Sequence, residues 1–202
     1  MTASRRGSLP PVVVWERVVM SVNLWHDLDP GPAVPDILNV IVEIPRGSRN
    51  KYEYHKQTGA IKLDRVLYSP VFYPGDYGFI PQTYYDDGDP LDVLVVTNAP
   101  TFPGCVVEAR PIGIFHLVDR GEPDDKILAV LHYDPFFNDI KTYTELPAHF
   151  LKEVTHFFSV YKDLEGVRTE ALGWEGPECA KERVKYAIDH YWDMRAGRLG
   201  RT

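Results

Sequence analysis

The chain has 202 residues, enough for one domain with a substantial core. Its 29 acidic and 22 basic residues give a formal net charge of −7, which argues against general nucleic-acid binding because that function usually needs a basic face. No apolar run approaches the roughly 18 residues of a membrane span, and the only two cysteines, Cys105 and Cys179, form no CxxC pair. We therefore expect a soluble single-domain protein of the reducing cytoplasm, without a zinc ribbon.

The first 20 residues contain Arg5, Arg6 and a short apolar run, Val12–Trp15. Glu16 and Arg17 interrupt this run and no small-residue cleavage site follows, so the segment does not match a signal peptide. We expect residues 1–20 to be a disordered extension or the product of an upstream start, with Met20 as the alternative start. A single domain is expected over residues 21–202.

Strands are predicted first along the chain. The β-branched run Ile37–Ile44 is typical of a core strand. Tyr52–His55 and Ala60–Leu67 flank a Gln-Thr-Gly turn and predict a hairpin. Three further apolar stretches predict strands: Leu91–Thr97, Cys105–Val118 and Ile127–Leu131.

Two helices are predicted towards the end of the chain. Over Pro147–Leu164 the apolar residues change to helical spacing, including Phe150, Val154 and Phe157. A second helix begins near Pro177, because proline is favoured in the first turn of a helix. Without repeats or a low-complexity linker, the pattern predicts one α+β domain: a small, strongly curved sheet or closed barrel with two helices packed against it.

The segment Asp86-Asp87-Gly88-Asp89-Pro90-Leu91-Asp92 places four carboxylates within seven residues. Glycine and proline favour a fixed turn here. Carboxylates at this density repel one another, and a divalent cation such as Mg²⁺, which prefers carboxylate oxygen, relieves that repulsion. The alternative is a solvated acidic turn, but Asp92 lies in an apolar strand where a bare charge is costly. A calcium EF-hand loop fits poorly, because its required glycine and glutamate correspond here to Asp92 and Asn98.

Two further acidic sites lie at predicted strand ends. The turn from Asp119 to Lys126 contains three more aspartates, and taken alone it would be an ordinary hairpin loop. Glu43 lies in the apolar run Val-Glu-Ile-Pro-Arg, and its alternative is an edge residue that faces water. The three acidic sites can converge only if the fold brings these strand ends together, as a barrel of short strands does.

Four cationic side chains complete the pattern: Lys51, Arg65, Lys126 and Lys162. Each of them alone would be a surface side chain with a partly buried stem. Together with metal-loaded carboxylates they indicate a phosphate-binding site. Because a protein of net charge −7 would otherwise repel a polyanion, the metals would form part of the binding surface.

The segment Asp87-Gly-Asp-Pro-Leu-Asp92, followed by a valine, resembles the D-x-D-P-x-D signature of the family I soluble inorganic pyrophosphatases. The likeness extends from about Val22 to Trp192 and includes five other blocks in the family's order: Glu43–Tyr54, Lys62–Arg65, Tyr73–Phe79, Asp119–Lys126 and His156–Glu165. The resemblance implies an OB-like five-stranded closed β-barrel with two C-terminal helices. It also implies an enzyme that uses Mg²⁺ to hydrolyse pyrophosphate into two orthophosphates.

The resemblance further implies a role for each of fourteen residues. The tighter metal would be held by Asp87, Asp92 and Asp124. Asp92 would also bridge to a second metal. Metals that arrive with the substrate would be held by Glu43, Asp119 and Asp124. Asp89 would be the general base for the attacking water. Phosphate oxygens would be contacted by Lys51, Arg65, Lys126, Tyr161 and Lys162, with hydrogen-bonding support from Glu53, Tyr73 and Tyr77.

The resemblance implies several Mg²⁺ ions in each active site, with Mn²⁺ or Zn²⁺ as substitutes. It also implies a cytoplasmic homo-oligomer, commonly a hexamer, whose substrate is a small molecule and which binds neither nucleic acid nor membrane.

Two other functions would use the same features. A metal-dependent phosphatase or nucleotide pyrophosphohydrolase would use the same carboxylates and would also act on nucleoside triphosphates. A non-catalytic OB-type binding module would need a basic aromatic groove, but the aromatic stretches Tyr68–Tyr85 and Tyr133–Phe137 also carry aspartates, which repel a nucleic-acid backbone. The histidines, among them His55, His116 and His156, show no paired ligand spacing, so we expect structural roles for them and no zinc chemistry. No P-loop motif occurs.

Overall fold

Five strands form a ring in the structure, a computed structural model that describes residues 22–198. Their spatial order is β1 (Leu38–Ile44), β4 (Asp76–Phe79), β5 (Asp92–Val96), β8 (Lys126–Leu131) and β6 (Val106–Asp119), and β6 pairs again with β1. The β5–β8 pair is parallel and the other pairs are antiparallel. This ring fits the OB-like barrel expected from the sequence. The expectations for residues 1–20 and for Met20 lie outside the described residues.

The long strand β6 connects the ring to its surroundings. Its pairing with β8 shifts register between Pro111 and Gly113, and its end pairs with the two-residue strand β7 (Glu122–Pro123). Outside the ring, β6 also pairs with β9 (Thr169–Glu175). The sequence pattern did not predict β4, β7 or β9, and the prediction that strands precede both helices is wrong for β9. Its sequence, TEALGWE, has few apolar residues, and pairing with β6 rather than propensity makes it a strand.

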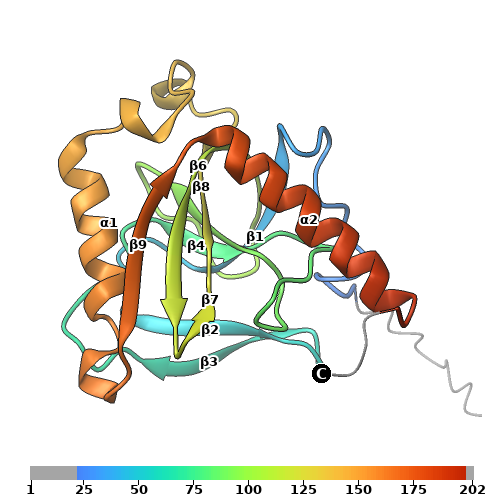
Figure 1. Cartoon of the computed structure of the whole chain (residues 1–202), viewed down its shortest axis with the longest axis horizontal. Coiled ribbons are helices and arrows are strands. Elements are labelled where there is room, and N and C mark those ends of the chain that lie inside the picture. Colours follow the sequence, from blue (N-terminus) through green and yellow to red (C-terminus); the bar gives the residue numbers. More distant parts are fainter. Residues whose placement is uncertain (1–21, 199–202) are drawn as a thin grey trace, which may run out of the picture.

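Two helices cover different sides of the strands (Figure 1). The helix α1 (Ala148–Val160) contacts β9 and buries Val154, Phe157 and Phe158. The helix α2 (Pro177–Arg195) packs on β6 through Ala180 and other small apolar residues. Both predicted helices are present, but α1 ends four residues before the predicted Leu164. A 3-10 turn, Asp163–Glu165, follows it, and further 3-10 turns cover Pro135–Phe137 and Tyr143–Glu145.

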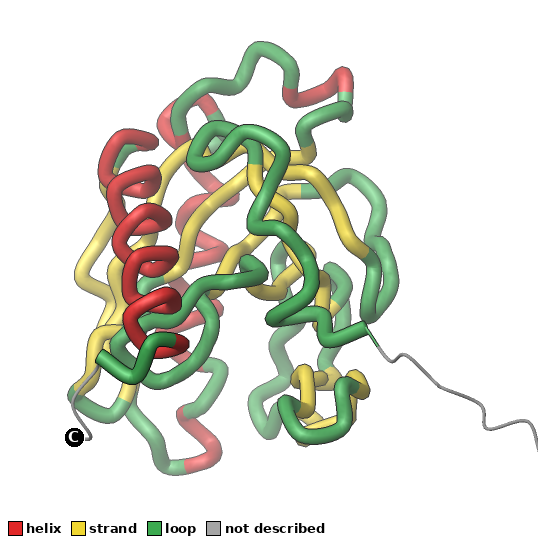
Figure 2. The backbone as a smooth tube through the Cα atoms, turned by 90° about the vertical axis from the view of Figure 1, so that its right-hand side faces the viewer, coloured by secondary structure: helices red, strands yellow, loops and turns green. Residues whose placement is uncertain are grey.

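The predicted hairpin forms a separate two-stranded sheet of β2 (Asn50–His55) and β3 (Ala60–Val66). It lies at the lower end of the molecule in Figure 1 and in Figure 2, close to the end of β6 in Figure 1. Within residues 22–198 no helix is long and apolar enough to cross a lipid bilayer. Neither Cys105 nor Cys179 forms a disulfide in the described part of the chain.

We predict that Gly78 is required for the close contact between β1 and β4. A Cβ atom at Gly78 would lie 1.8 Å from the carbonyl oxygen of Ile41. Gly78→Ala should therefore lower the free energy of unfolding by about 3 kcal/mol, because the backbone of a paired strand must move. At the control position Gly176 a Cβ would meet nothing within 4 Å, and we expect Gly176→Ala to cost less than about 1 kcal/mol. Urea unfolding measures both values, and equal losses would contradict the prediction.

Candidate active site

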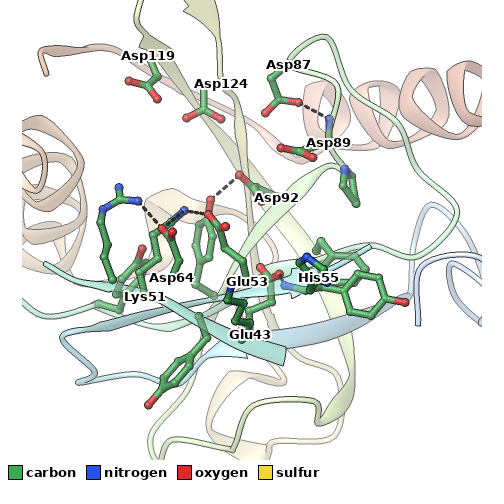
Figure 3. A pocket seen from close by; sticks show the side chains of 18 of the residues that line it. Glu43, Lys51, Glu53, His55, Asp64, Asp87, Asp89, Asp92, Asp119 and Asp124 are labelled. Atoms are coloured by element: carbon green, nitrogen blue, oxygen red, sulfur yellow. Dashed lines mark hydrogen bonds and ion pairs between the residues drawn. The ribbon is translucent and has the colours of Figure 1, made fainter. Parts of the chain in front are cut away.

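The hairpin β2–β3 and the ends of the ring strands enclose a cleft of about 650 Å³. Its walls include all fourteen residues to which the sequence resemblance gives roles. In Figure 3, Asp119, Asp124, Asp87 and Asp89 lie along one side, and Glu43, Lys51 and Glu53 lie on the side of the hairpin. Three acidic segments that are far apart in the sequence therefore converge in one place.

The acidic loop before β5 is held by its own backbone. Gly88 has a positive φ of 84°, and its N–H donates to the carbonyl of Tyr85 at 3.0 Å. The N–H of Tyr85 donates to the carbonyl of Asp89 at 2.7 Å, and the N–H of Asp89 donates to Oδ1 of Asp87 at 3.0 Å. Burial, with a further contribution from the charge of Asp92, raises the pKa of Asp87 to about 6. The loop thus keeps the carboxylates together, and as a consequence the ionised form of Asp87 is less favourable than it would be in water.

The second acidic segment enters the cleft through a tight turn. Arg120 and Gly121 both have positive φ, at 53° and 90°, as a type I′ hairpin turn requires. After this turn the N–H of Asp124 donates to the carbonyl of Leu117 at 2.8 Å. The turn thereby brings Asp124 back beside Asp119, and the predicted hairpin loop becomes part of the site wall.

Lysine side chains neutralise the carboxylates. The parallel register of β5 and β8 places Asp92 opposite Lys126, whose Nζ donates to Asp92 at 2.5 Å and also to Asp124. The side chain of Lys126 is 3% exposed. Its burial opposes the charge, but Asp92 and Asp124 outweigh that cost and raise the pKa of Lys126. In the same way the Nζ of Lys162 donates to Oδ2 of Asp119 at 2.5 Å.

Three buried tyrosines supply neutral donors around these charges. Burial and the neighbouring carboxylates raise the pKa values of Tyr73, Tyr77 and Tyr161 well above the ordinary value. The hydroxyl of Tyr77 donates to Asp92, and the Nζ of Lys162 lies 5.1 Å from the ring centre of Tyr161. These hydroxyls therefore stay protonated at neutral pH and can donate hydrogen bonds.

Glu43 is a half-buried residue of the cleft and does not face open water at a sheet edge. Its Oε1 accepts the backbone N–H of Tyr54 at 2.6 Å. Burial raises the pKa of Glu43 to about 8 despite this hydrogen bond, and the charge of Asp92 adds to the shift. A cation beside Glu43 would favour its ionised form.

On the hairpin, Lys51 pairs with Glu53 and lies 3.7 Å from Asp64. The Nε of Arg65 donates to Oε1 of Glu165 at 3.0 Å, which holds the guanidinium at the cleft. This ion pair and the charge of Asp64 outweigh burial and raise the pKa of Arg65. Sequence reasoning gave no role to Asp64 or Glu165, because only the folded chain shows that they orient cations.

Lys56 is a further residue that the sequence analysis missed. Its Nζ contacts the Asp89 carboxylate and donates to the carbonyl of Gly88 at 3.1 Å. The same Nζ lies 4.9 Å from the ring centre of Trp25. Lys56 thus connects the hairpin turn to the acidic loop, and this link between segments more than 30 residues apart leaves no local pattern in the sequence.

The residues present fit hard divalent cations. Eight carboxylates and seven lysine or arginine side chains line the cleft, so the chain's own charges almost cancel and a polyanion gains little attraction without added cations. Oδ1 of Asp119 is buried and has no hydrogen-bond partner among the residues that the structure describes. Carboxylate oxygens are the ligands that Mg²⁺ and similar ions prefer.

Comparisons with known proteins agree with this chemistry. Residues 40–192 match the family described as "Inorganic pyrophosphatase". The chain is 47% identical to the inorganic pyrophosphatase of Picrophilus torridus over 85% of this chain and 97% of that protein, and 51% identical to the one from Haloferax volcanii over 84% and 97%. The crystal structure of inorganic pyrophosphatase from Thermus thermophilus matches with a TM-score of 0.82 and 42% identity, covering 85% of this chain and 99% of that one.

Metal-free protein should lose stability as Glu43 ionises. The pKa of Glu43 is 4.5 in a model peptide and about 8 in the fold, so its contribution to stability is fully present below pH 4.5 and is lost as the pH rises through 8. Glu43→Gln should therefore exceed the wild type in free energy of unfolding at pH 9, on the order of 2 kcal/mol, and not at pH 4.5. Urea unfolding in the presence of a chelator measures the difference.

The matched control for this prediction is Glu182→Gln on the exposed face of α2. Its carboxylate is hydrated in both the folded and the unfolded chain, so we expect no comparable gain at pH 9. A gain from Glu43→Gln that is the same at both pH values would contradict the prediction.

Proposed function

The chain belongs to the inorganic pyrophosphatase family, and on that basis we propose that it hydrolyses pyrophosphate to two orthophosphates in this cleft, with Mg²⁺ as cofactor and Asp89 as general base. The observation that carries the proposal is the convergence of eight carboxylates with lysine and arginine side chains in one cleft. The metals are cationic and the substrate is anionic. The cleft offers carboxylates to the metals and lysine and arginine side chains to the substrate.

The carboxylates divide into two groups. We propose that the tighter metal is held by Asp87, Asp92 and Asp124, and that Glu43 and Asp119, with Asp124, hold metals that arrive with the substrate. Bound divalent cations would supply two effects: they lower the pKa of a water molecule from about 15.7 towards neutrality and offset negative charge on the phosphate.

Lys126 and Lys162 have a second function in this proposal. Without metal, their ammonium groups are the counter-ions of Asp92, Asp124 and Asp119. When a cation takes over that part, both ammonium groups become available to phosphate oxygens. The same side chains therefore stabilise the metal-free fold and bind the substrate.

The phosphoanhydride bond is protected from nucleophiles by its own negative charge. In our proposal Lys51, Arg65, Lys126 and Lys162 neutralise the phosphoryl oxygens and the leaving phosphate, as cationic groups do in phosphoryl transfer generally. The protonated hydroxyl of Tyr161 donates a further hydrogen bond. Tyr73, Tyr77 and Glu53 hold these groups in position.

Asp89 is the proposed acceptor of the proton from the attacking water. Its side chain is 59% exposed, so it is open to the cleft and to water, and it contacts the Nζ of Lys56. A base with this access needs only to reorient to receive a proton. General-base catalysis of this kind commonly contributes about 10²–10⁴-fold.

We also propose, from the family resemblance, that the protein is cytoplasmic and forms a homo-oligomer. The number of subunits is tested by light scattering on the full chain, with a hexamer as the expected result.

The decisive assay of function measures phosphate release from pyrophosphate with and without Mg²⁺, and with Mn²⁺ or Zn²⁺ in its place. We expect release only with a divalent cation, and much slower release from a nucleoside triphosphate. Comparable rates on both substrates would favour a nucleotide pyrophosphohydrolase or general phosphatase. No release from pyrophosphate under any of these conditions would overturn the proposal.

We predict that Asp89→Asn lowers kcat by about 10²–10⁴-fold, because the amide cannot accept the proton. The fold and the affinity for Mg²⁺ should change little, since Asp89 lies outside the proposed ligand set. Steady-state kinetics at neutral pH measure the loss. The matched control is Asp86→Asn in the same loop: Asp86 bonds the Tyr186 hydroxyl and does not line the cleft, so kcat should stay near that of the wild type. Near-normal turnover in Asp89→Asn would exclude the base role.

We predict a different defect for Asp92→Asn. Asp92 lies at the centre of the carboxylate group, and its loss as a ligand should raise the Mg²⁺ concentration for half-maximal activity by at least about 10-fold. A Mg²⁺ titration followed both by activity and by thermal unfolding measures the shift. An unchanged Mg²⁺ dependence in both readouts would show that Asp92 is not a metal ligand.

A further inference from the structure

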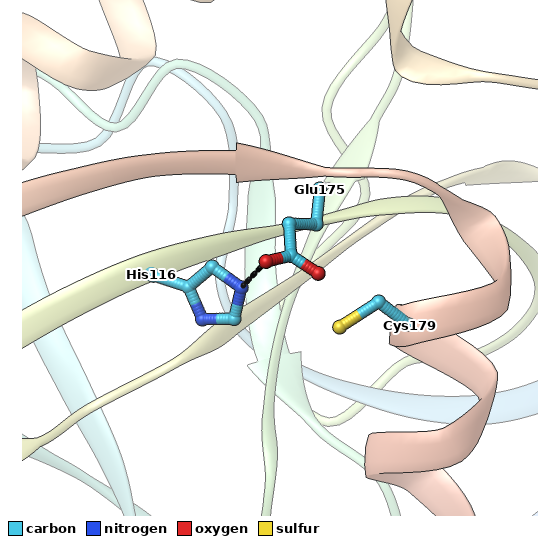
Figure 4. A group of neighbouring side chains, drawn as sticks. All are labelled: His116, Glu175 and Cys179. Atoms are coloured by element: carbon cyan, nitrogen blue, oxygen red, sulfur yellow. Dashed lines mark ion pairs between the residues drawn. The ribbon is translucent and has the colours of Figure 1, made fainter.

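Three metal-ligating side chains meet outside the cleft, where β6, the end of β9 and the first turn of α2 come together (Figure 4). They are His116, Glu175 and Cys179, and their ligand atoms all lie within 4.8 Å of one another. The pairing of β6 with β9 and the packing of α2 on β6 bring them into contact. None of these residues takes part in the proposed hydrolysis.

His116 is oriented in the way that metal-binding histidines usually are. Its Nδ1 lies 2.9 Å from Oδ1 of Asp125. A carboxylate only accepts, so Nδ1 donates, and the neutral ring then carries its free lone pair on Nε2. Asp125 is buried and is itself held by the hydroxyl of Tyr85 at 2.7 Å and the Nε of Arg183 at 3.5 Å. A carboxylate behind a ligating histidine is a common arrangement at metal sites.

The other nitrogen of His116 lacks a partner. Nε2 is buried, has no hydrogen-bond partner within residues 22–198, and faces Oε1 of Glu175 at 3.8 Å. A lone pair that faces a carboxylate oxygen is unfavourable unless a positive charge lies between them. That charge is either a second proton on His116 or a metal ion, and the Cys179 thiol next to the pair favours a metal.

We propose that His116, Glu175 and Cys179 form a zinc site that is separate from the carboxylate cleft. One imidazole nitrogen, one carboxylate oxygen and one sulfur form a ligand set that suits Zn²⁺ and not Mg²⁺. Tetrahedral zinc would place these atoms roughly 3.3–3.7 Å apart, so the side chains must close by about 1 Å. The exposed side chain of Glu175 has the freedom to do so. Water takes the fourth position.

Zinc binding changes the state of the cysteine. Burial and the neighbouring Glu175 raise the pKa of the Cys179 thiol to about 11, so it is protonated without metal. On binding, the S–H bond breaks, the proton passes to solvent and the thiolate bonds to zinc, without any oxidation or reduction. The site would bind the start of α2 to β6 and β9. This proposal departs from the expectation of a purely structural His116 and does not depend on the hydrolase proposal.

The test uses the full chain, stripped of transition metals and kept in excess Mg²⁺ so that the cleft carboxylates are occupied. Co²⁺ is added as a spectroscopic substitute for zinc, followed by Zn²⁺. We expect one Co²⁺ per chain with thiolate-to-cobalt absorption in the near ultraviolet, and loss of that absorption when Zn²⁺ displaces it. Zn²⁺ should also raise the melting temperature of the wild type.

Variants identify the ligands. Cys179→Ser should abolish the thiolate absorption, and the matched control Cys105→Ser should retain it, because Cys105 has no place in the cluster. Glu175→Gln, in a side chain that is 61% exposed, should weaken Co²⁺ binding by at least about 10-fold, and Asp125→Asn by about 10–100-fold. Circular dichroism confirms that each variant is folded.

Three results would overturn the proposal. The first is the absence of thiolate absorption in the wild type, which would mean that a proton and not a metal lies between His116 and Glu175. The second is absorption that survives Cys179→Ser. The third is an unchanged Co²⁺ affinity in folded Glu175→Gln and His116→Gln.

Discussion

Mutual repulsion among the carboxylates of the cleft is the constraint to which the surrounding structure responds. Asp87, Asp92 and Asp124 lie within one cavity, and burial raises the pKa values of Asp87 and Asp124. The chain counters the repulsion with the buried ammonium group of Lys126, which contacts two of these carboxylates. A buried charge is tolerated only when it is paired and hydrogen-bonded, and here each partner satisfies the other.

This arrangement gives a reason for the lysines that lie among the carboxylates proposed as metal ligands. If the carboxylates were left without counter-ions, the metal-free fold would carry their full repulsion. Lys126 and Lys162 pair with these carboxylates in the structure. In the proposed reaction a bound cation would replace these ammonium groups as the partner of the carboxylates, and the ammonium groups would then be free to bind phosphate. The affinities for metal and for substrate would thereby be coupled.

Much of the fold follows from local pattern, and the exceptions have physical causes. The apolar runs of β1, β5, β6 and β8 and the helical spacing of α1 and α2 predict those elements, because burial on one face or both leaves a periodic trace. By contrast, β4 is four residues long and has a glycine where β1 comes too close for a Cβ. The strand β9 has few apolar residues, and its pairing with β6 is what makes this segment a strand.

The site divides in the same way. Asp87, Asp89 and Asp92 are predictable because a short acidic turn before an apolar strand is visible in the sequence, and the flanking blocks extend the resemblance to the other cleft residues. Lys56 and Glu165 act on residues about 30 and 100 positions away, so only the folded chain reveals them. His116 is far along the chain from Glu175 and Cys179, so no local pattern groups the three, and the zinc site proposed for them departs from the expectation of no zinc chemistry.

The two sites meet at one peptide bond. Asp124 lines the cleft, whereas its neighbour Asp125 turns to the other side and holds His116 through Nδ1. Neighbouring residues of an extended segment point to opposite sides, so this position can serve both. Because Asp125 is also fixed by Tyr85 and Arg183, the backbone that carries Asp124 is anchored from behind. A metal on His116, as proposed above, would therefore act on the same segment that positions Asp124, a proposed metal ligand of the cleft, and this segment offers one route for coupling between the two sites.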